Sequence, residues 1–178
     1  MKKQLLLSIF GVALALFSLE SVAQVSITTA GSAVTQNFDG LGSANNSSVP
    51  AGFKIGTDWS TGTTVVTQAA GTSGAGILTG SSSGGVYNFA NGVTATATDR
   101  ALGFLSTGSF SSPRSIMYAF TNNTGATITS IDLAWNYEKY RSGTRAFDWT
   151  FFHGSTSAAT TAATSGDQAY PSDANNTV

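Results

Sequence analysis

Apolar and polar residues alternate along much of the second half of the chain. This period of two is typical of β-strands that bury one face. It occurs in three stretches, whose in-phase residues are Ile116, Tyr118 and Phe120; Ile131, Leu133, Trp135 and Tyr137; and Phe147, Trp149 and Phe151. Because large aromatic residues in an apolar phase usually pack inside, we predict that Trp135 and Trp149 face the core. The Asn-Asn-Thr-Gly turn at 122–125 is predicted to join two adjacent antiparallel strands.

The first half of the chain is predicted to hold shorter strands separated by Gly, Asn and Ser turns. They lie within residues 24–29, 51–60, 63–68, 76–80, 85–90 and 93–109, and the segment "TATAT" places Thr94, Thr96 and Thr98 on one strand face. No convincing helix follows residue 23. Many short strands with turn signals at short spacing predict an all-β fold, a β-sandwich of Greek-key or jelly-roll type.

The N-terminus has the features of a secretory signal peptide. Lys2 and Lys3 are followed by a short apolar run, and Ser21-Val22-Ala23 places small residues before a cleavage point at Gln24. No second apolar span follows, so no membrane span is expected after cleavage. We therefore predict a signal peptide at 1–23, a β-sandwich module at 24–153 and a secreted or cell-surface location.

Residues 154–178 are rich in Ser, Thr and Ala and are predicted to be a linker or the incomplete remainder of the module. The most convincing core strands come late, and the chain finishes in "SDANNTV" without a further predicted strand. Two interpretations stay open. The sandwich is truncated and its remaining strands lie downstream, or it is a complete small sandwich with a flexible tail.

Composition excludes several functional classes. Without residues 1–23 the chain keeps six Lys and Arg against eight Asp and Glu, so it is close to neutral and has no basic patch for nucleic acid. It has no Cys, which excludes disulfides, thiolate catalysis and Cys-ligated metals. His153 is the only histidine, Glu138 the only glutamate after residue 23, and the Asp residues are scattered singly. We predict no catalysis by this chain, because no convergent catalytic group can be named.

Calcium is the one cofactor with candidate ligands. Asp39, Asp58 and Asp99 lie at predicted turns, where jelly-roll sandwiches often bind Ca²⁺. No Asp-x-Asp spacing occurs, and Asp is a common turn-former that hydrogen-bonds its own backbone. The turn role is therefore favoured over calcium binding.

The segments "QNFDGLG", "PAGF", "TDRALGFLSTGS" and "FTNNTGATITSIDLAWNYEKYR" together resemble a known module, over residues 36–153. It is the N-terminal β-sandwich of secreted multidomain proteins common in Bacteroidetes and other environmental bacteria. Those proteins often carry a type IX secretion sorting domain or a similar C-terminal tail, and some carry lamin-tail, immunoglobulin-like, nuclease or phosphatase domains. This sequence lacks the strands and Asp-rich segment that the resemblance implies after Phe152, and it has no sorting tail.

The resemblance implies a compartment and a fold but assigns no activity to any position. It places Phe38 and Asp39 at a first turn, the "DRALG" turn at Asp99, Arg100 and Gly103, and Glu138 and Arg141 at the end of the strand after the Asn-Thr-Gly turn. Charged residues are scarce in this chain. We therefore predict an Arg100–Glu138 ion pair that joins the "DRALG" turn to the sheet.

Carbohydrate binding is the most specific functional hypothesis, since sugar-binding sandwiches use exposed aromatic faces beside a few polar groups. Trp59, Tyr140 and Arg141 are the candidate ligand-binding residues. The sequence thus favours a non-catalytic extracellular module for adhesion or for binding polysaccharide or cell-surface material. Two alternatives remain: an accessory domain of a longer secreted hydrolase or nuclease, and a purely structural surface protein.

Overall fold

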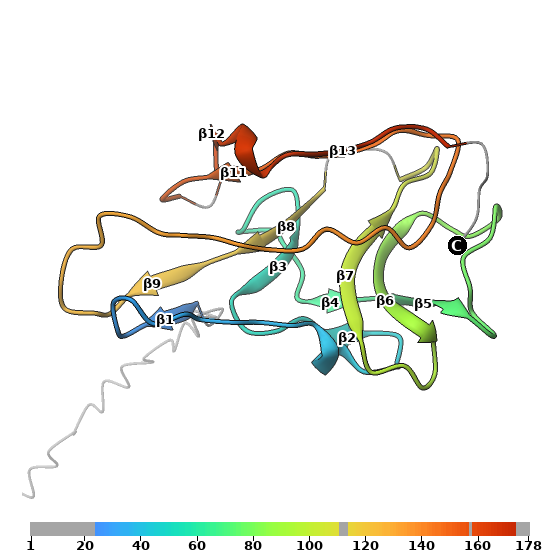
Figure 1. Cartoon of the computed structure of the whole chain (residues 1–178), viewed down its shortest axis with the longest axis horizontal. Coiled ribbons are helices and arrows are strands. Elements are labelled where there is room, and N and C mark those ends of the chain that lie inside the picture. Colours follow the sequence, from blue (N-terminus) through green and yellow to red (C-terminus); the bar gives the residue numbers. More distant parts are fainter. Residues whose placement is uncertain (1–23, 111–113, 157, 174–178) are drawn as a thin grey trace, which may run out of the picture.

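The computed structural model describes residues 24–110, 114–156 and 158–173, so the predicted signal peptide lies outside the described residues. The regular secondary structure of the described residues is nearly all β-strand, with two short 3₁₀ turns, η1 (Asp39–Leu41) and η2 (Thr164–Gly166). The all-β, sandwich-like prediction is confirmed (Figure 1). No helix in the described part of the chain is long and apolar enough to cross a membrane.

The best-formed sheet has three strands and lies on the right of Figure 1. It contains β5 (Gln68–Ser73), β6 (Gly85–Val93) and β7 (Arg100–Leu105), in that order. β6 and β7 pair antiparallel, whereas β5 and β6 pair parallel, with Gln68 opposite Tyr87 and an irregularity between Gly71 and Ser73. Parallel neighbours need a crossover connection. Residues 74–84 form this connection, and four of them line a pocket.

The other described strands pair in twos. β3 (Phe53–Gly56) is antiparallel to β8 (Ser115–Tyr118), and β1 (Val25–Ile27) is parallel to β9 (Phe120–Asn122). The remaining antiparallel pairs are β2 (Ser47–Ser48) with β4 (Val65–Val66), β10 (Phe147–Trp149) with β13 (Gln168–Tyr170), and β11 (Phe152–His153) with β12 (Thr161–Ala162).

Two groups of buried side chains form the core. The first contains Leu41, Val49, Ile55, Val66 and Leu102, and Phe38 and Phe53 pack against it. The second contains Ala70, Leu78, Tyr87, Phe89 and Tyr140. Both groups draw on the three-stranded sheet, so this sheet is the structural centre of the protein.

The structure corrects the prediction for residues 131–137. They form no strand, and no backbone hydrogen bond joins residues 127–139 to another described residue. The segment runs across the molecule in Figure 1 (orange) after the 122–125 turn, and β9 pairs with β1 rather than with it. Trp135 is 42% exposed rather than buried, and Ile131 and Leu133 are also exposed. Trp149 is half-buried, with its ring 5.4 Å from Phe104 and 5.9 Å from Tyr137.

Two further expectations change. The stretch 154–178, predicted to be a linker or the incomplete remainder of the module, contains β12, η2 and β13; β12 pairs with β11, and β13 pairs with β10. The predicted Thr strand is a turn instead, in which Thr96 and Ala97 donate backbone N–H groups to the Val93 carbonyl at 3.0 and 2.9 Å. Its Thr side chains therefore do not form a flat array.

Candidate functional site

Buried Arg100 holds the Thr94–Ala97 turn in place. Its side chain is only 4% exposed, and it donates from Nε to the Ala97 carbonyl at 2.9 Å and from Nη2 to the Thr94 carbonyl at 2.6 Å. Its backbone N–H donates to Asp39 Oδ1 at 3.0 Å, which fastens η1 to the start of β7. Arg100 therefore acts as a structural clamp on two turns.

The predicted Arg100–Glu138 ion pair does not form between these two described residues. The Arg100 guanidinium is directed to backbone carbonyls, while the exposed Glu138 carboxylate accepts a hydrogen bond from the Tyr140 hydroxyl. A buried guanidinium can be satisfied by carbonyl oxygens of a nearby turn as well as by a carboxylate. Sequence spacing gave no means of separating these two arrangements.

Tyr140 is buried and is not available as a surface contact for a ligand. Its ring stacks on Phe89 at 4.9 Å, and Phe89 stacks on Tyr87 at 5.3 Å, with both pairs of rings 10° from parallel. Burial, followed by the hydrogen bond to Glu138, raises the pKa of Tyr140 well above its usual range. Tyr140 thus ends a buried ladder of three aromatic rings.

Trp59 and Arg141 are the other predicted ligand residues. Trp59 is half-buried, its carbonyl accepts a 2.9 Å hydrogen bond from the buried Lys54 ammonium, and that Nζ lies 5.2 Å from the indole centroid. Arg141 is half-buried. None of Trp59, Tyr140 and Arg141 lines the pocket between β5 and residues 74–84 that is described below.

The three candidate calcium ligands serve separate turns. Asp58 accepts hydrogen bonds from the Ser60 and Thr61 backbone at 2.8 and 3.1 Å, and its pKa is lowered, chiefly by the Ser60 hydroxyl. Asp39 binds the Arg100 N–H, and Asp99 accepts from the Asn91 amide at 3.2 Å. Within the described residues no group of three His, Cys, Asp or Glu side chains could hold a metal ion.

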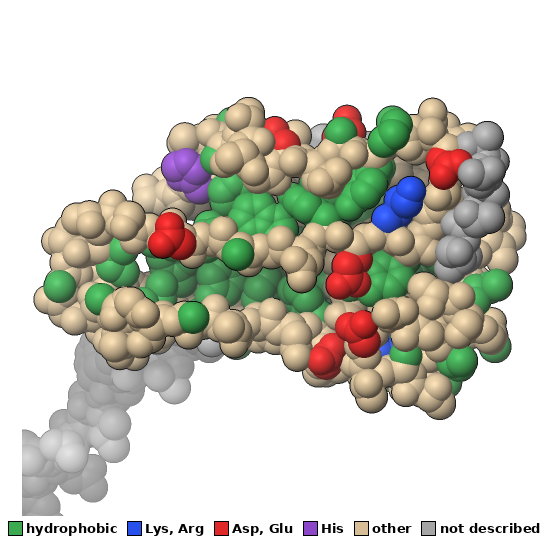
Figure 2. Space-filling view, viewed as in Figure 1, with side chains coloured by type: hydrophobic (Ala, Val, Ile, Leu, Met, Phe, Trp, Pro, Cys, Tyr) green, Lys and Arg blue, Asp and Glu red, His purple; other side chains and the backbone are tan. Residues whose placement is uncertain are grey.

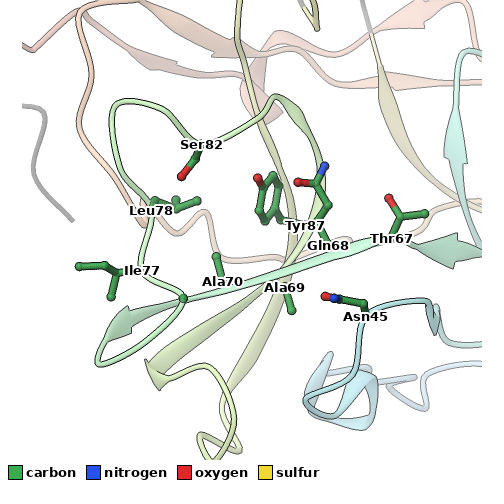
Figure 3. A pocket seen from close by; sticks show the side chains of 10 residues that line it. Asn45, Thr67, Gln68, Ala69, Ala70, Ile77, Leu78, Ser82 and Tyr87 are labelled. Atoms are coloured by element: carbon green, nitrogen blue, oxygen red, sulfur yellow. The ribbon is translucent and has the colours of Figure 1, made fainter.

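A pocket that was not predicted from the sequence lies between β5 and the 74–84 crossover (Figure 3). It has a volume of about 320 Å³, at the lower end of the range of roughly 300–1,000 Å³ for small-molecule sites. We call it the crossover pocket, and its lining residues are Asn45, Thr67, Gln68, Ala69, Ala70, Gly76, Ile77, Leu78, Ser82 and Tyr87.

The crossover forms one side of the pocket. The chain must pass over β5 here, because β6 runs parallel to β5. A turn closed by two hydrogen bonds holds the crossover, one from the Ser82 N–H to the Thr79 carbonyl at 3.1 Å and one from the Thr79 N–H to Ser82 Oγ at 2.8 Å. Leu78 of the crossover is 4% exposed and packs in the second core group. Gly76 has φ +86, a left-handed conformation that suits glycine.

The pocket combines polar side chains with an apolar wall. Leu78, Ala70 and Tyr87 supply the wall, and the Tyr87 hydroxyl donates to the Ser83 carbonyl at 2.7 Å. Gln68 makes a long hydrogen bond of 3.5 Å from Nε2 to the Gly84 carbonyl. Its Oε1 and the side chains of Asn45 and Thr67 form no hydrogen bond with other described residues.

Three uncommitted polar side chains and one aromatic ring thus line the pocket, and this combination can bind a small polar ligand. In Figure 3, Gln68 lies on the side of β5 that carries Leu78 and Tyr87, and Asn45 lies on the other side. The Gly/Ser-rich composition of residues 74–84 was the only signal in the sequence. It predicted loops around a short strand at 76–80, where the structure has only an isolated bridge between Ile77 and Gly71, and it did not indicate what these loops surround. Comparison with protein-family models, with curated proteins and with solved structures finds no match.

Proposed function

We propose that the protein is a secreted, non-catalytic binding module that recognises a carbohydrate unit in the crossover pocket. The observation that carries this proposal is the set of uncommitted polar side chains, Asn45, Thr67 and Gln68, beside the wall formed by Leu78 and Tyr87. Sugars present hydroxyl groups on their edges and C–H groups on their faces, so they need polar and apolar surfaces together.

The proposed contacts divide by chemistry. The amides of Asn45 and Gln68 each offer both a donor and an acceptor, and the Thr67 hydroxyl offers the same in one group. These match vicinal sugar hydroxyls, which also donate and accept. A pocket of this size accommodates a terminal or single sugar unit better than a long chain threaded through it.

Secretion and absence of catalysis remain part of the proposal. The apolar N-terminal run behind Lys2 and Lys3 supports export. The only histidine, His153, is exposed on β11. Its ring stacks against that of Phe151, with the centroids 6.5 Å apart, and this contact accounts for it without a catalytic role. Neither His153 nor an acidic side chain lines the crossover pocket.

A glycan array followed by calorimetric titration of each hit tests the proposal. Gln68→Ala and Asn45→Ala are expected to weaken binding by about fivefold each, since a neutral hydrogen bond contributes about 1 kcal/mol. Gln168→Ala is the matched control: Gln168 lies on β13, and its Nε2 bonds only the Ala169 carbonyl in the described structure. Absence of binding across mono- and oligosaccharides, or equal affinity in all three variants, would refute the assignment.

A further inference from the structure

Residues 127–139 combine two properties that are seldom found together. They run across the molecule as a long stretch outside any described strand, and their backbone makes no hydrogen bond to another described residue (Figure 1). The sequence nevertheless alternates as a half-buried strand does. Unpaired N–H and C=O groups in such a stretch form a ready template for another strand.

The contacts at the end of this segment show that its side chains alternate in direction. Trp135 packs against Phe151, with ring centroids 4.9 Å apart, and the Tyr137 hydroxyl donates to the Gly166 carbonyl at 2.7 Å. Both side chains therefore reach the layer of β10, β11 and η2. Tyr140 instead stacks on Phe89 of β6. Trp135 and Tyr137 therefore point to the side of β10, β11 and η2, whereas Tyr140, just after the segment, points to β6.

Apolar side chains are exposed along the same segment. Ile131 is 45% exposed, Leu133 is 50% exposed and Trp135 is 42% exposed. Figure 2 shows a band of hydrophobic side chains along the face that the segment crosses in Figure 1. An apolar row beside open backbone groups is typical of a surface that pairs with a further strand.

We propose that a second copy of this chain covers the segment, by antiparallel pairing of residues 127–139 about a two-fold axis centred at Ala134. In such a symmetric pair each residue faces one of the same parity, because both strands present the same face on the same side. This restriction leaves few registers, and the charges of the segment discriminate among them.

The register centred at Ala134 matches the side chains of the two copies. Leu133 faces Trp135, and Ile131 faces Tyr137. Each carboxylate meets a hydrogen-bonding partner, since Asp132 faces Asn136, and Glu138 faces Ser130 in the same way. Lys139 faces Thr129. Cross-strand pairs of these kinds are neutral or favourable.

The neighbouring registers are disfavoured by their charges. Centring on Trp135 places Asp132 opposite Glu138, a like-charge pair that destabilises a sheet. Centring on Leu133 places Ile128 opposite Glu138. Centring on Asn136 places Leu133 opposite Lys139, which covers an apolar side chain with a charge.

The absence of cysteine allows a direct test of the register in the full chain. Ala134→Cys is expected to form a disulfide-linked dimer under mild oxidation, because opposed residues in an antiparallel pair have Cα atoms about 4.5–5.5 Å apart, within the disulfide range. Ser130→Cys is the control. It faces residue 138, so the two sulfurs would lie roughly 27 Å apart along the strands, and no cross-link is expected.

Sedimentation velocity from micromolar to several hundred micromolar protein supplies the second measurement. Unsubstituted chain is expected to show a concentration-dependent dimer. Ala134→Asp, which opposes two carboxylates, is expected to weaken the dimer at least tenfold more than the isosteric Ala134→Asn. Residue 134 is exposed, so the thermal stability of the monomer serves to confirm folding of both variants.

A monomer at every concentration, or equal cross-linking at residues 130 and 134, would overturn the proposal. So would a monomer in which the amides of 127–139 are protected from hydrogen exchange, because a strand other than a second copy would then cover the segment. None of these outcomes depends on carbohydrate binding, which is measured separately in the crossover pocket.

Discussion

Replacing Arg100 with methionine tests the clamp on the Thr94–Ala97 turn. The substitution keeps an unbranched side chain of similar length and removes two charge-assisted hydrogen bonds, those from Nε and Nη2 to the Ala97 and Thr94 carbonyls. Hydrogen bonds to charged groups contribute about 1.5–3 kcal/mol each. Part of the lost stabilisation is offset, because burying methionine does not require a charge to be desolvated. In addition, Nη1 of Arg100 is buried without a hydrogen-bond partner among the described residues.

The net expectation is a loss of about 2–4 kcal/mol in the free energy of unfolding, which is a large fraction of a typical domain's stability. Urea unfolding followed by tryptophan fluorescence measures it, with the m-value checked for constancy. Arg145→Met is the matched control. Arg145 is exposed, so its replacement is expected to change the free energy by no more than about 0.5 kcal/mol.

The same assay separates the clamp from the ion pair with Glu138 that the sequence suggested. Glu138→Gln is expected to leave the effect of Arg100→Met unchanged within about 0.5 kcal/mol in a double-mutant cycle. The reasoning fails if Arg100→Met behaves as Arg145→Met does. A coupling energy above about 1 kcal/mol would instead support the ion pair.

Two other expectations follow from the aromatic ladder. Gly103→Ala places a Cβ 2.8 Å from the Phe89 ring, so it is expected to lower the free energy of unfolding by about 1–3 kcal/mol in the same urea assay. Gly125→Ala is the control. Its Cβ has no atom within 4 Å, so this variant measures the cost of a positive φ alone. The folded-state pKa of Tyr140 lies above its ordinary value of 10.0, so its neutral form is favoured by folding. That contribution is fully present below pH 10 and is lost as the pH rises toward the folded pKa. Tyr140→Phe should therefore flatten the fall in stability above pH 10, and an unchanged slope would contradict burial of this hydroxyl.

Alternation along the chain predicted strands well where the partner strand is in place. The alternating stretches at Ile116 and Phe147 contain strands, and so do the stretches at Val25 and Phe53, which were predicted from the turn residues around them. Residues 131–137 carry the same pattern without a strand. A periodic pattern identifies a face but carries no information about the distant residues that complete its hydrogen bonds.

The candidate site was less accessible to sequence reasoning. Tyr140 falls outside the alternating phase and close to three charged residues, which suggested exposure, yet stacking on Phe89 some fifty residues earlier buries it. The crossover pocket depends on β5 and β6 being parallel, and nothing local in the Gly/Ser-rich stretch specifies the direction of the neighbouring strand. Pairing direction and long-range stacking are properties of the whole chain.

The parallel pairing of β1 with β9 also sets the order in which the protein can fold. Val25 lies opposite Phe120, so the first strand finds its partner only after nearly a hundred further residues are present. Contacts of such long sequence separation give a high contact order and slow folding. During synthesis the N-terminal strand therefore stays without its partner until the chain has extended past Phe120.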